Sequence, residues 1–219
     1  MGLKLRDGVS FCISNDQTVL CDIHNDRFFA LPPSWNSAFR AALSNDCHGD
    51  IDSALQPFFR SGLLLKTDDD QKPQALLLPT PTSSALDRPY SKVPIKSLIS
   101  GLFAHWLARH ALAHEHLKDT LARLSRRKAA NANAQFVSGD LSEILPAFLA
   151  TRRWMPSQDN CLPLSLALVE FLARRGAFPT LVIGVRMRPY GVHAWVQQGG
   201  LILNDRVDTV RRYTPIIAI

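Results

Sequence analysis

Three short runs of β-forming residues open the chain, and polar turns separate them. They read VSFCI, TVLCDIH and RFFAL and occupy residues 9–13, 17–23 and 27–31. This pattern predicts a three-stranded meander. A helical period follows, because Trp35, Phe39 and Leu43 stand four residues apart after a start at Pro33 and Ser34.

A second predicted helix starts near Asp50, runs through Phe59 and ends at Gly62. The sequence LLLKTDDD after it indicates a short strand and an acidic turn. Residues 71–93 are rich in Pro, Ser and Thr, a composition that cannot bury a core and is typical of a linker. We therefore expect a first domain over residues 1–70 with a β-β-β-α-α order.

Helical periods dominate the chain after the linker, and strands return near its end. The predicted helices cover residues 94–114, 115–130, 140–150 and 161–175, and the predicted strands cover residues 180–187, 192–198 and 201–205. Helices and strands segregated in this way predict a second domain of the α+β class over residues 94–219.

Composition narrows the range of partners. The chain has 219 residues and a net charge of +6, with 46% hydrophobic and 20% charged residues. Its basic residues are spread out and form no dense stripe with aromatic residues, so we expect no nucleic-acid partner. No apolar run reaches the roughly 20 residues that cross a bilayer, and the amino terminus lacks the features of a secretory signal. These observations predict a cytoplasmic protein without a membrane segment.

The cysteines and paired histidines give no metal signature. No CxxC pair is present, which excludes a zinc ribbon or a thioredoxin motif. Cys12, Cys21 and Cys47 are interpreted as small buried residues. His110 and His114 have a spacing that can hold zinc, but no further ligand stands at a matching distance, so no metal is expected.

Cys161 differs from the other cysteines, because it directly precedes an apolar helix (LPLSLALVEFLARRG) with Asp159 or Asn160 available as the N-cap. A thiol on the first turn of a helix faces unpaired backbone N–H groups and the positive end of the helix dipole, which favour the nucleophilic thiolate. The same N–H groups can hold the oxyanion of a tetrahedral intermediate. A buried structural cysteine is the alternative interpretation.

His193 lies on the apolar strand VHAWV, after the helix that Cys161 begins and one further strand. A helix followed by strands can return the chain so that the imidazole stands over the amino end of the helix. There it can accept the thiol proton and later protonate a leaving amine. A core histidine without a catalytic role is the alternative.

The hairpin around Gly199 and Gly200 decides which acidic residue can orient His193. A two-residue loop pairs His193 with Arg206 and turns Asp205 to the other face of the sheet. A loop one residue longer pairs His193 with Asp205 directly. We predict the longer loop, because Asp205 can then fix the imidazole tautomer and stabilise its cation.

Two other residues compete with Asp205 for this orienting role. Asn204 can take it only if the shorter loop forms, and Asp208 lies just beyond the pairing. The predicted constellation remains a thiol, an imidazole and an orienting group, as in nucleophilic peptidases.

Three segments of the second half of the chain carry a family resemblance. The segments CLPLSLALVEFLARRG, LVIGVRMRPYGVHAWV and LILND resemble the carboxy-terminal peptidase domain of lasso-peptide B proteins, which are transglutaminase-like, papain-related cysteine proteases. The resemblance covers about residues 95–219. It implies a triad of Cys161, His193 and Asp205, and it makes Gln158 a further candidate oxyanion donor, although its spacing from Cys161 is shorter than the papain-like pattern.

The first domain also resembles that family. TVLCDIHNDRFFALPPSWNSAFRAAL followed by ALQPFFRSGLLL is similar to the small winged-helix-like element that binds leader peptides of ribosomally made natural products. The resemblance implies that the leader docks as an added strand beside the third strand and against the second helix. The implied leader-binding residues are Arg27, Phe28, Phe29, Ala30, Leu31, Leu55 and Phe58.

We therefore expect a cysteine peptidase that removes the leader from a lasso-peptide precursor. The resemblance implies two partners, the precursor peptide and an asparagine-synthetase-like cyclase. It also links such proteins to ATP, but no segment resembles a nucleotide site, so no cofactor is expected. Two alternatives stay open: an acyltransferase of the same fold, and a non-catalytic module that binds and delivers the leader.

Overall fold

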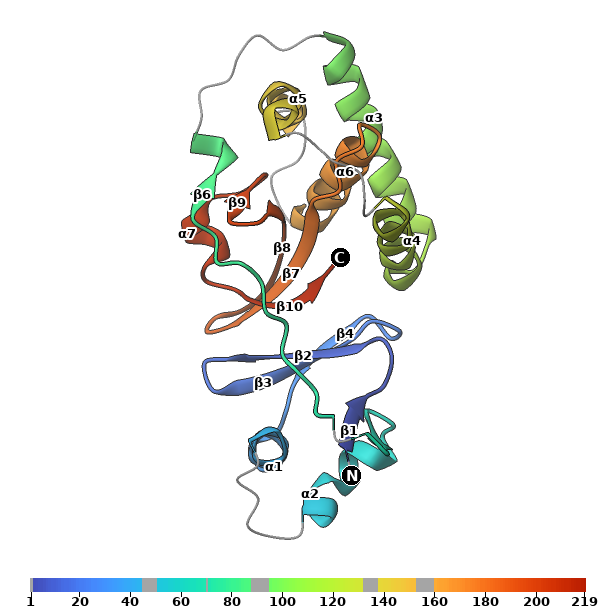
Figure 1. The fold of residues 1–219 in the computed structure, drawn as a ribbon, viewed down its shortest axis with the longest axis vertical. Coiled ribbons are helices and arrows are strands. Elements are labelled where there is room, and N and C mark those ends of the chain that lie inside the picture. The colour runs from blue at the N-terminus through green and yellow to red at the C-terminus, as the bar shows by residue number, and fades with distance from the viewer. Residues whose placement is uncertain (1, 45–50, 70, 88–94, 132–137, 153–159) are drawn as a thin grey trace. The chain divides into compact units, whose positions relative to one another are not determined.

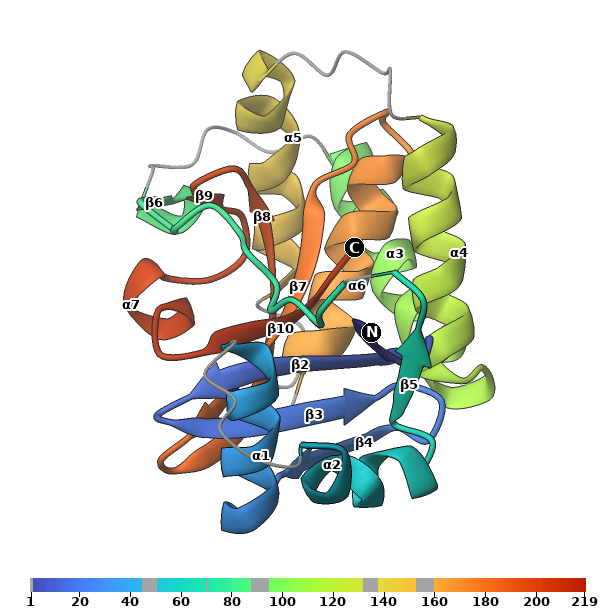
Figure 2. The same cartoon turned by 60° about the horizontal axis from the view of Figure 1, so that its bottom comes forward.

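The computed structural model describes residues 2–44, 51–69, 71–87, 95–131, 138–152 and 160–219. The chain forms two compact units, shown in Figures 1 and 2. The first consists of Met1–Leu77 with Val185–Gly191, and the second of Leu78–Gly184 with Val192–Ile219. Among the described residues, no helix has both the length and the apolar character that a membrane span requires.

The first unit has the predicted three strands and two helices in the predicted order, and they are confirmed at nearly the predicted positions. The elements are β2 (Val9–Ser14), β3 (Gln17–Asp22), β4 (Arg27–Ala30), α1 (Pro33–Leu43) and α2 (Ile51–Arg60). The strands pair antiparallel in the order β2-β3-β4. The predicted short strand β5 (Leu64–Thr67) is also present, and it pairs with a strand that the pattern did not predict, β1 (Gly2–Leu5).

The core of the first unit lies between the three-stranded sheet and the two helices. Phe11 of β2, Phe39 of α1 and Phe58 of α2 meet there, with ring centroids 5.1 Å apart for Phe11 and Phe39 and 5.6 Å apart for Phe39 and Phe58. Leu31 and Leu55 belong to the same buried cluster. The apolar residues that recur along the two helices therefore pack into this core.

The second unit carries the remaining elements, apart from the ends of β7 and β8 that fall within Val185–Gly191 of the first unit. Its helices are α3 (Ile95–His114), α4 (Leu117–Ala130), α5 (Ser138–Thr151), α6 (Cys161–Ala173) and the short α7 (Val207–Val210). Its strands are β6 (Ser83–Ser84), β7 (Thr180–Met187), β8 (Tyr190–Gln198), β9 (Leu201–Ile202) and β10 (Thr214–Ala218). They form a sheet in the order β10-β7-β8-β9-β6, so the mixed α+β class is confirmed.

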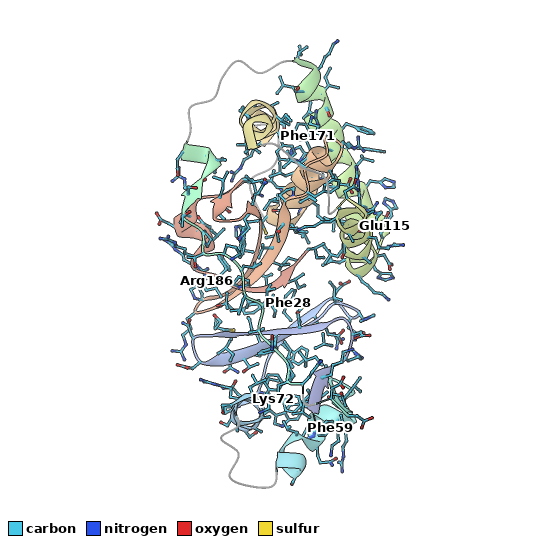
Figure 3. All side chains as sticks on the ribbon, viewed as in Figure 1. Phe28, Phe59, Lys72, Glu115, Phe171 and Arg186 are labelled. Atoms are coloured by element: carbon cyan, nitrogen blue, oxygen red, sulfur yellow. The ribbon has the colours of Figure 1, made fainter. Side chains whose placement is uncertain are left out.

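Helix α3 packs closely against α6 and α5 because its inward positions are small. Gly101, Ala104 and Ala108 are buried on this side, whereas Trp106 points outward and is 57% exposed. Within the helical layer, Phe171 of α6 (Figure 3) is fully buried. Its ring centroid lies 5.3 Å from that of Phe148 in α5. Helix α6, which begins at Cys161, is therefore packed against both α3 and α5.

Part of the predicted linker belongs to the sheet. Strand β6 lies in the predicted linker range of residues 71–93, yet it pairs in parallel with β9. The backbone N–H groups of Thr82 and Ser83 donate to the carbonyl of Gly200, and the Ser84 hydroxyl donates to the carbonyl of Asp205. The linker prediction was wrong here, because backbone pairing and small polar side chains hold a segment that has few apolar residues.

The loop between β8 and β9 differs from the prediction. Gln198 pairs with Leu201, so the loop has the two residues Gly199 and Gly200 and not three. Gly199 has φ +57°, in the left-handed region, and Gly200 lies outside it. Positive φ at the first loop position alone is the pattern of a type II′ hairpin turn, whose twist suits two antiparallel strands. The predicted three-residue register is therefore wrong.

We predict that Phe58 acts in the core and not as a surface contact. Phe58→Ala should destabilise the first unit by about 3–5 kcal/mol, as expected for a large ring removed from a packed site. Phe28→Ala is the matched control, since its half-buried ring should cost less than about half as much. Hydrogen exchange of β2 and β3 peptides in the full chain measures both effects. A stable Phe58→Ala protein that has lost only peptide affinity would contradict this assignment.

Candidate active site

Cys161 is the first residue of α6 and is partly exposed. Asn160 occupies the N-cap position, but its side chain makes no capping hydrogen bond. The backbone N–H groups of Leu162 and Ala194 and the imidazole of His193 lie near the Cys161 sulfur and act to lower the pKa of its thiol. The helix start therefore offers the sulfur the donors that stabilise a thiolate.

His193 connects the thiol to a carboxylate. Its Nε2 lies 2.5 Å from Oδ2 of Asp205, and both side chains are mostly buried. The imidazole also contacts two aromatic rings, with centroid distances of 5.0 Å to Tyr213 and 6.2 Å to Trp195. The structure thus brings the three predicted residues Cys161, His193 and Asp205 into one chain of contacts.

Asp205 reaches His193 although the observed register does not pair them. The ladder between β8 and β9 continues to Leu203, whose N–H donates to the carbonyl of Val196. Residues 203–205 then bend away from the strand. The predicted strand over residues 201–205 is therefore too long, and the bend, not strand pairing, directs the Asp205 carboxylate to the imidazole.

Burial and hydrogen bonding oppose each other in the pKa values of this triad. Burial acts to raise the Cys161 pKa, but the hydrogen bonds from His193 and Ala194 outweigh it, and the pKa is lowered. Burial acts to lower the His193 pKa, but the bonds to Asp205 and Cys161 raise it to about 9. For Asp205, the bonds from His193 and the Arg206 N–H outweigh burial and lower the pKa. Each shift therefore favours the charged form of its group: the thiolate of Cys161, the imidazolium of His193 and the carboxylate of Asp205.

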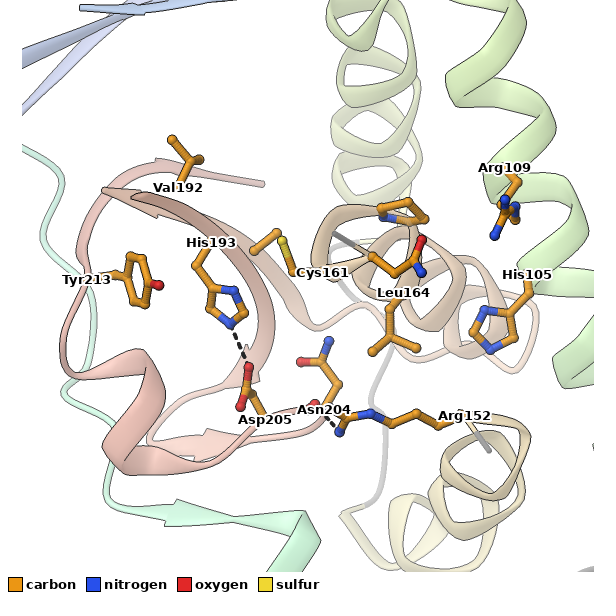
Figure 4. Close-up of a pocket in the computed structure, with 13 residues that line it drawn as sticks. His105, Arg109, Arg152, Cys161, Leu164, Val192, His193, Asn204, Asp205 and Tyr213 are labelled. Atoms are coloured by element: carbon orange, nitrogen blue, oxygen red, sulfur yellow. Dashed lines mark hydrogen bonds and ion pairs between the residues drawn. The ribbon is translucent and has the colours of Figure 1, made fainter. Parts of the chain in front are cut away.

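The triad lines a cleft of about 410 Å³ in the second unit (Figure 4). Tyr213 and His193 lie on one side of Cys161, and His105 and Arg109 of α3 lie on the other. The remaining lining includes Arg152, Asn160, Pro163, Leu164, Val192, Ala194 and Asn204. Such a cleft can hold a short peptide segment against the sulfur.

Sequence reasoning missed several residues of this site. Tyr213 lies after the last predicted strand, and Arg152 follows α5, where it donates to the carbonyl of Asn204 at 3.2 Å. Ser165 stands one helical turn after Cys161, on a helix whose neighbouring positions are apolar. That isolated hydroxyl was a usable signal, whereas nothing in the local sequence links Arg152 or Tyr213 to His193.

The predicted leader-binding residues divide into two groups. Leu31 is 2% exposed and Leu55 and Phe58 are fully buried, so these three are core residues without a surface for a peptide. Arg27 and Ala30 are exposed, and Phe28 and Phe29 are half-buried on β4. Among the described strands, β4 pairs only with β3.

The other residues that the sequence analysis considered do not line the cleft, or lie outside the described residues. The rings of His110 and His114 stack with centroids 4.2 Å apart, and the described residues contain no group of three or more potential metal ligands. Cys12 and Cys21 are buried, which raises the pKa of each thiol to about 12. Asp208 is exposed on α7. Gln158, Asp159, Trp154 and Cys47 lie outside the described residues.

The fold and the site agree with the comparison to known families. Residues 104–218 match the Transglutaminase-like superfamily. The match covers more than half of the chain, so the protein belongs to this superfamily, whose members are typically cysteine peptidases or acyltransferases.

A curated protein is also similar to part of the chain. Microcin J25-processing protein McjB from Escherichia coli is 44% identical over 48 residues, which are 22% of this chain and 23% of that protein. The alignment thus spans less than a quarter of the relative's length. No solved structure matches the chain significantly.

We predict that Cys161 reacts with alkylating agents at a lower pH than an ordinary thiol does. The imidazolium of His193 persists up to about pH 9, so alkylation by iodoacetamide should be fast near neutral pH and should depend on His193. His193→Ala removes the stabilising cation and should slow alkylation near neutral pH by about tenfold or more, one pKa unit being a factor of ten. Mass spectrometry of the Cys161 peptide over a pH series measures this, with Cys21 as the internal unreactive control. Equal rates in both proteins would contradict the ion pair.

Proposed function

We propose that this protein is a cysteine peptidase that removes the leader from a lasso-peptide precursor. The main observation that supports this proposal is the arrangement of the Cys161 sulfur, His193 and Asp205, which adjoin one another in that order inside an open cleft. The superfamily supports thiol chemistry, and the similar protein McjB is named for processing a microcin. The lasso-peptide precursor is proposed as the substrate because both halves of the chain resemble that family.

The proposed reaction starts with the thiolate. Cys161 attacks the carbonyl carbon of the leader–core amide, and the backbone N–H groups at the start of α6 stabilise the oxyanion. The His193 imidazolium gives its proton to the leaving nitrogen, so the carbon–nitrogen bond breaks and the core leaves with a free amine. The neutral imidazole then takes a proton from water, and hydroxide attack on the thioester releases the leader acid and restores the thiolate.

The leader is proposed to dock on the free side of β4. The N–H of Leu31 donates to the carbonyl of Thr18, which marks the bonded pairs of the β3–β4 ladder. Since bonded and non-bonded pairs alternate, the backbone groups of Phe28 and Ala30 point away from β3. They are the groups that an added peptide strand would pair with.

The freed core amine suggests the second partner. A lasso ring needs that amine to form an amide with a side-chain carboxyl, and the family resemblance assigns this step to an asparagine-synthetase-like cyclase. We propose that the cyclase receives the core directly after cleavage.

We predict that the triad is needed for cleavage and not for leader binding. Cys161→Ala and His193→Ala should abolish leader removal, and Asp205→Asn should lower the rate by orders of magnitude, because an amide carries no charge to stabilise the imidazolium. Leader affinity, measured by anisotropy, should stay within about twofold because the leader docks on the other unit. Asp208→Asn is the matched acidic control and should cleave normally. Cleavage by the Cys161→Ala protein would contradict the assignment of Cys161 as the nucleophile.

The products separate the proposal from its rivals. Hydrolysis leaves a leader acid that has gained one water, whereas an acyltransferase joins the leader to an added amine. Mass spectrometry with and without a primary amine distinguishes these outcomes. A delivery module leaves the precursor intact in every case.

We predict that removing one outward backbone donor weakens docking. Ala30→Pro deletes the N–H that points away from β3 and leaves the bonded pairs of that ladder in place. Leader affinity should fall by about tenfold, the equivalent of one to two lost hydrogen bonds. Ala30→Ser keeps the donor and is the control. Cys161 alkylation should be the same in all three proteins, which shows that the second unit is unaffected. Unchanged affinity in Ala30→Pro would exclude docking at this edge.

A further inference from the structure

We propose that Asn204 is the positioning residue of the triad, which holds Asp205 against His193. This inference deepens the proposed function and rests on the same site. Asn204 is 2% exposed and stands directly before Asp205, at the point where the chain leaves the sheet. It lines the catalytic cleft, but it has no hydrogen bond to Cys161 or His193 among the contacts described.

The side chain of Asn204 replaces a backbone partner in the sheet. Leu203 and Val196 form a bonded pair, and Leu203 donates to the Val196 carbonyl at 2.8 Å. In a continued ladder the N–H of Val196 would donate back to the carbonyl of Leu203. It donates instead to Oδ1 of Asn204, at 2.8 Å. The ladder can therefore end at this residue without leaving a buried N–H unpaired.

The other end of the same amide binds the nucleophile helix. Nδ2 of Asn204 donates to Oγ of Ser165 at 2.8 Å, and Ser165 Oγ donates to the carbonyl of Ala194 at 3.0 Å. Ser165 is fully buried on α6, one turn after Cys161, and Ala194 is next to His193 on β8. One amide thus ties together the helix that carries the thiol, the strand that carries the imidazole and the bend that carries the carboxylate.

The backbone around this amide is held from two more elements. Arg152, after α5, donates to the Asn204 carbonyl at 3.2 Å, and Ser84 of β6 donates to the Asp205 carbonyl at 2.6 Å. With both peptide carbonyls bonded, the bend at residues 204 and 205 has little freedom to rotate. The Asp205 carboxylate is consequently aimed at the imidazole before substrate binds.

The chemistry explains why asparagine fits this position. The site needs one acceptor for the Val196 N–H and one donor for the Ser165 oxygen, and a primary amide supplies both. An apolar residue would leave a buried N–H unpaired. An aspartate would place a second negative charge next to Asp205 and would have no donor for Ser165. Leaving such buried groups unsatisfied loosens the bend and moves the carboxylate off the ring.

The test compares Asn204→Ala, Asp205→Asn and the double variant by two measurements. The first is the pH midpoint of Cys161 alkylation by iodoacetamide, and the second is kcat and KM for precursor cleavage. Asn204→Ala should raise the midpoint in the same direction as Asp205→Asn, and it should lower kcat by about a hundredfold with KM unchanged, as expected for a misplaced catalytic group. The double variant should show no further shift, because Asn204 acts through Asp205.

Two further variants separate positioning from stability. Ser165→Ala removes the acceptor for Asn204 and should give a smaller change of the same kind, not additive with Asn204→Ala. Thr120→Val is the control: Thr120 is buried on α4, and its hydroxyl donates to Glu115 between α3 and α4. Its loss should lower thermal stability while the midpoint and kcat stay at wild-type values.

The outcomes are distinct. Folded Asn204→Ala protein with a wild-type midpoint and kcat would overturn the positioning role, as would shifts that add to those of Asp205→Asn. If the wild-type protein itself showed an ordinary thiol midpoint and cleaved no precursor, the proposed function would fail instead.

Discussion

The geometry of the site depends on where the pairing between β8 and β9 stops. Strand pairing fixes which face of a sheet each side chain takes, and the observed register would turn Asp205 away from His193. Ending the ladder after Leu203 removes that constraint for the residues that follow. The change of direction requires partners for the backbone groups that the ladder no longer pairs, and Asn204 and Ser84 provide them. The 2.5 Å contact between His193 and Asp205 follows from this arrangement.

The three charged groups of the site stabilise one another against burial. Each alone would be pushed toward its neutral form, because burial penalises a charge. The thiolate holds the imidazolium, and the carboxylate holds it from the other side. Loss of Cys161 or Asp205 therefore removes an interaction that raises the pKa of His193, and loss of His193 removes one that lowers the pKa of each partner. This coupling explains why positioning the carboxylate matters for a sulfur that it does not touch.

Much of the fold could be predicted from residue patterns, and the exceptions have local causes. The meander, the two helices after it and the four long helices follow from periodicity and from Pro and Gly boundaries. Strand β1 was missed because Gly2 and Lys4 alternate with its leucines in a weak pattern, and β6 because serine has low strand propensity. These strands depend on partners distant in sequence.

The site was predictable in its members but not in its geometry. Cys161 can be identified from its place at a helix start, and His193 from its place on an apolar strand. Asp205 was correctly predicted as the acidic residue that contacts the imidazole. The reason given for it was wrong, since a two-residue turn of Gly199 and Gly200 sets the register. Asn204 was considered only as a substitute for Asp205. Its bonds to Val196 and Ser165 arise from tertiary packing, which no local pattern encodes.

Strand β6 has a consequence for how this chain can be divided. It comes before the helices of the second unit in sequence, yet it pairs with β9 and bonds to the residue that orients His193. A cut after residue 87, by a protease or by fission of the gene, would separate the edge strand from the sheet of the second unit. A cut before Leu78 would keep the strand with its sheet. If the two halves are inherited as separate proteins, the transglutaminase-like half has to begin well upstream of its first helix.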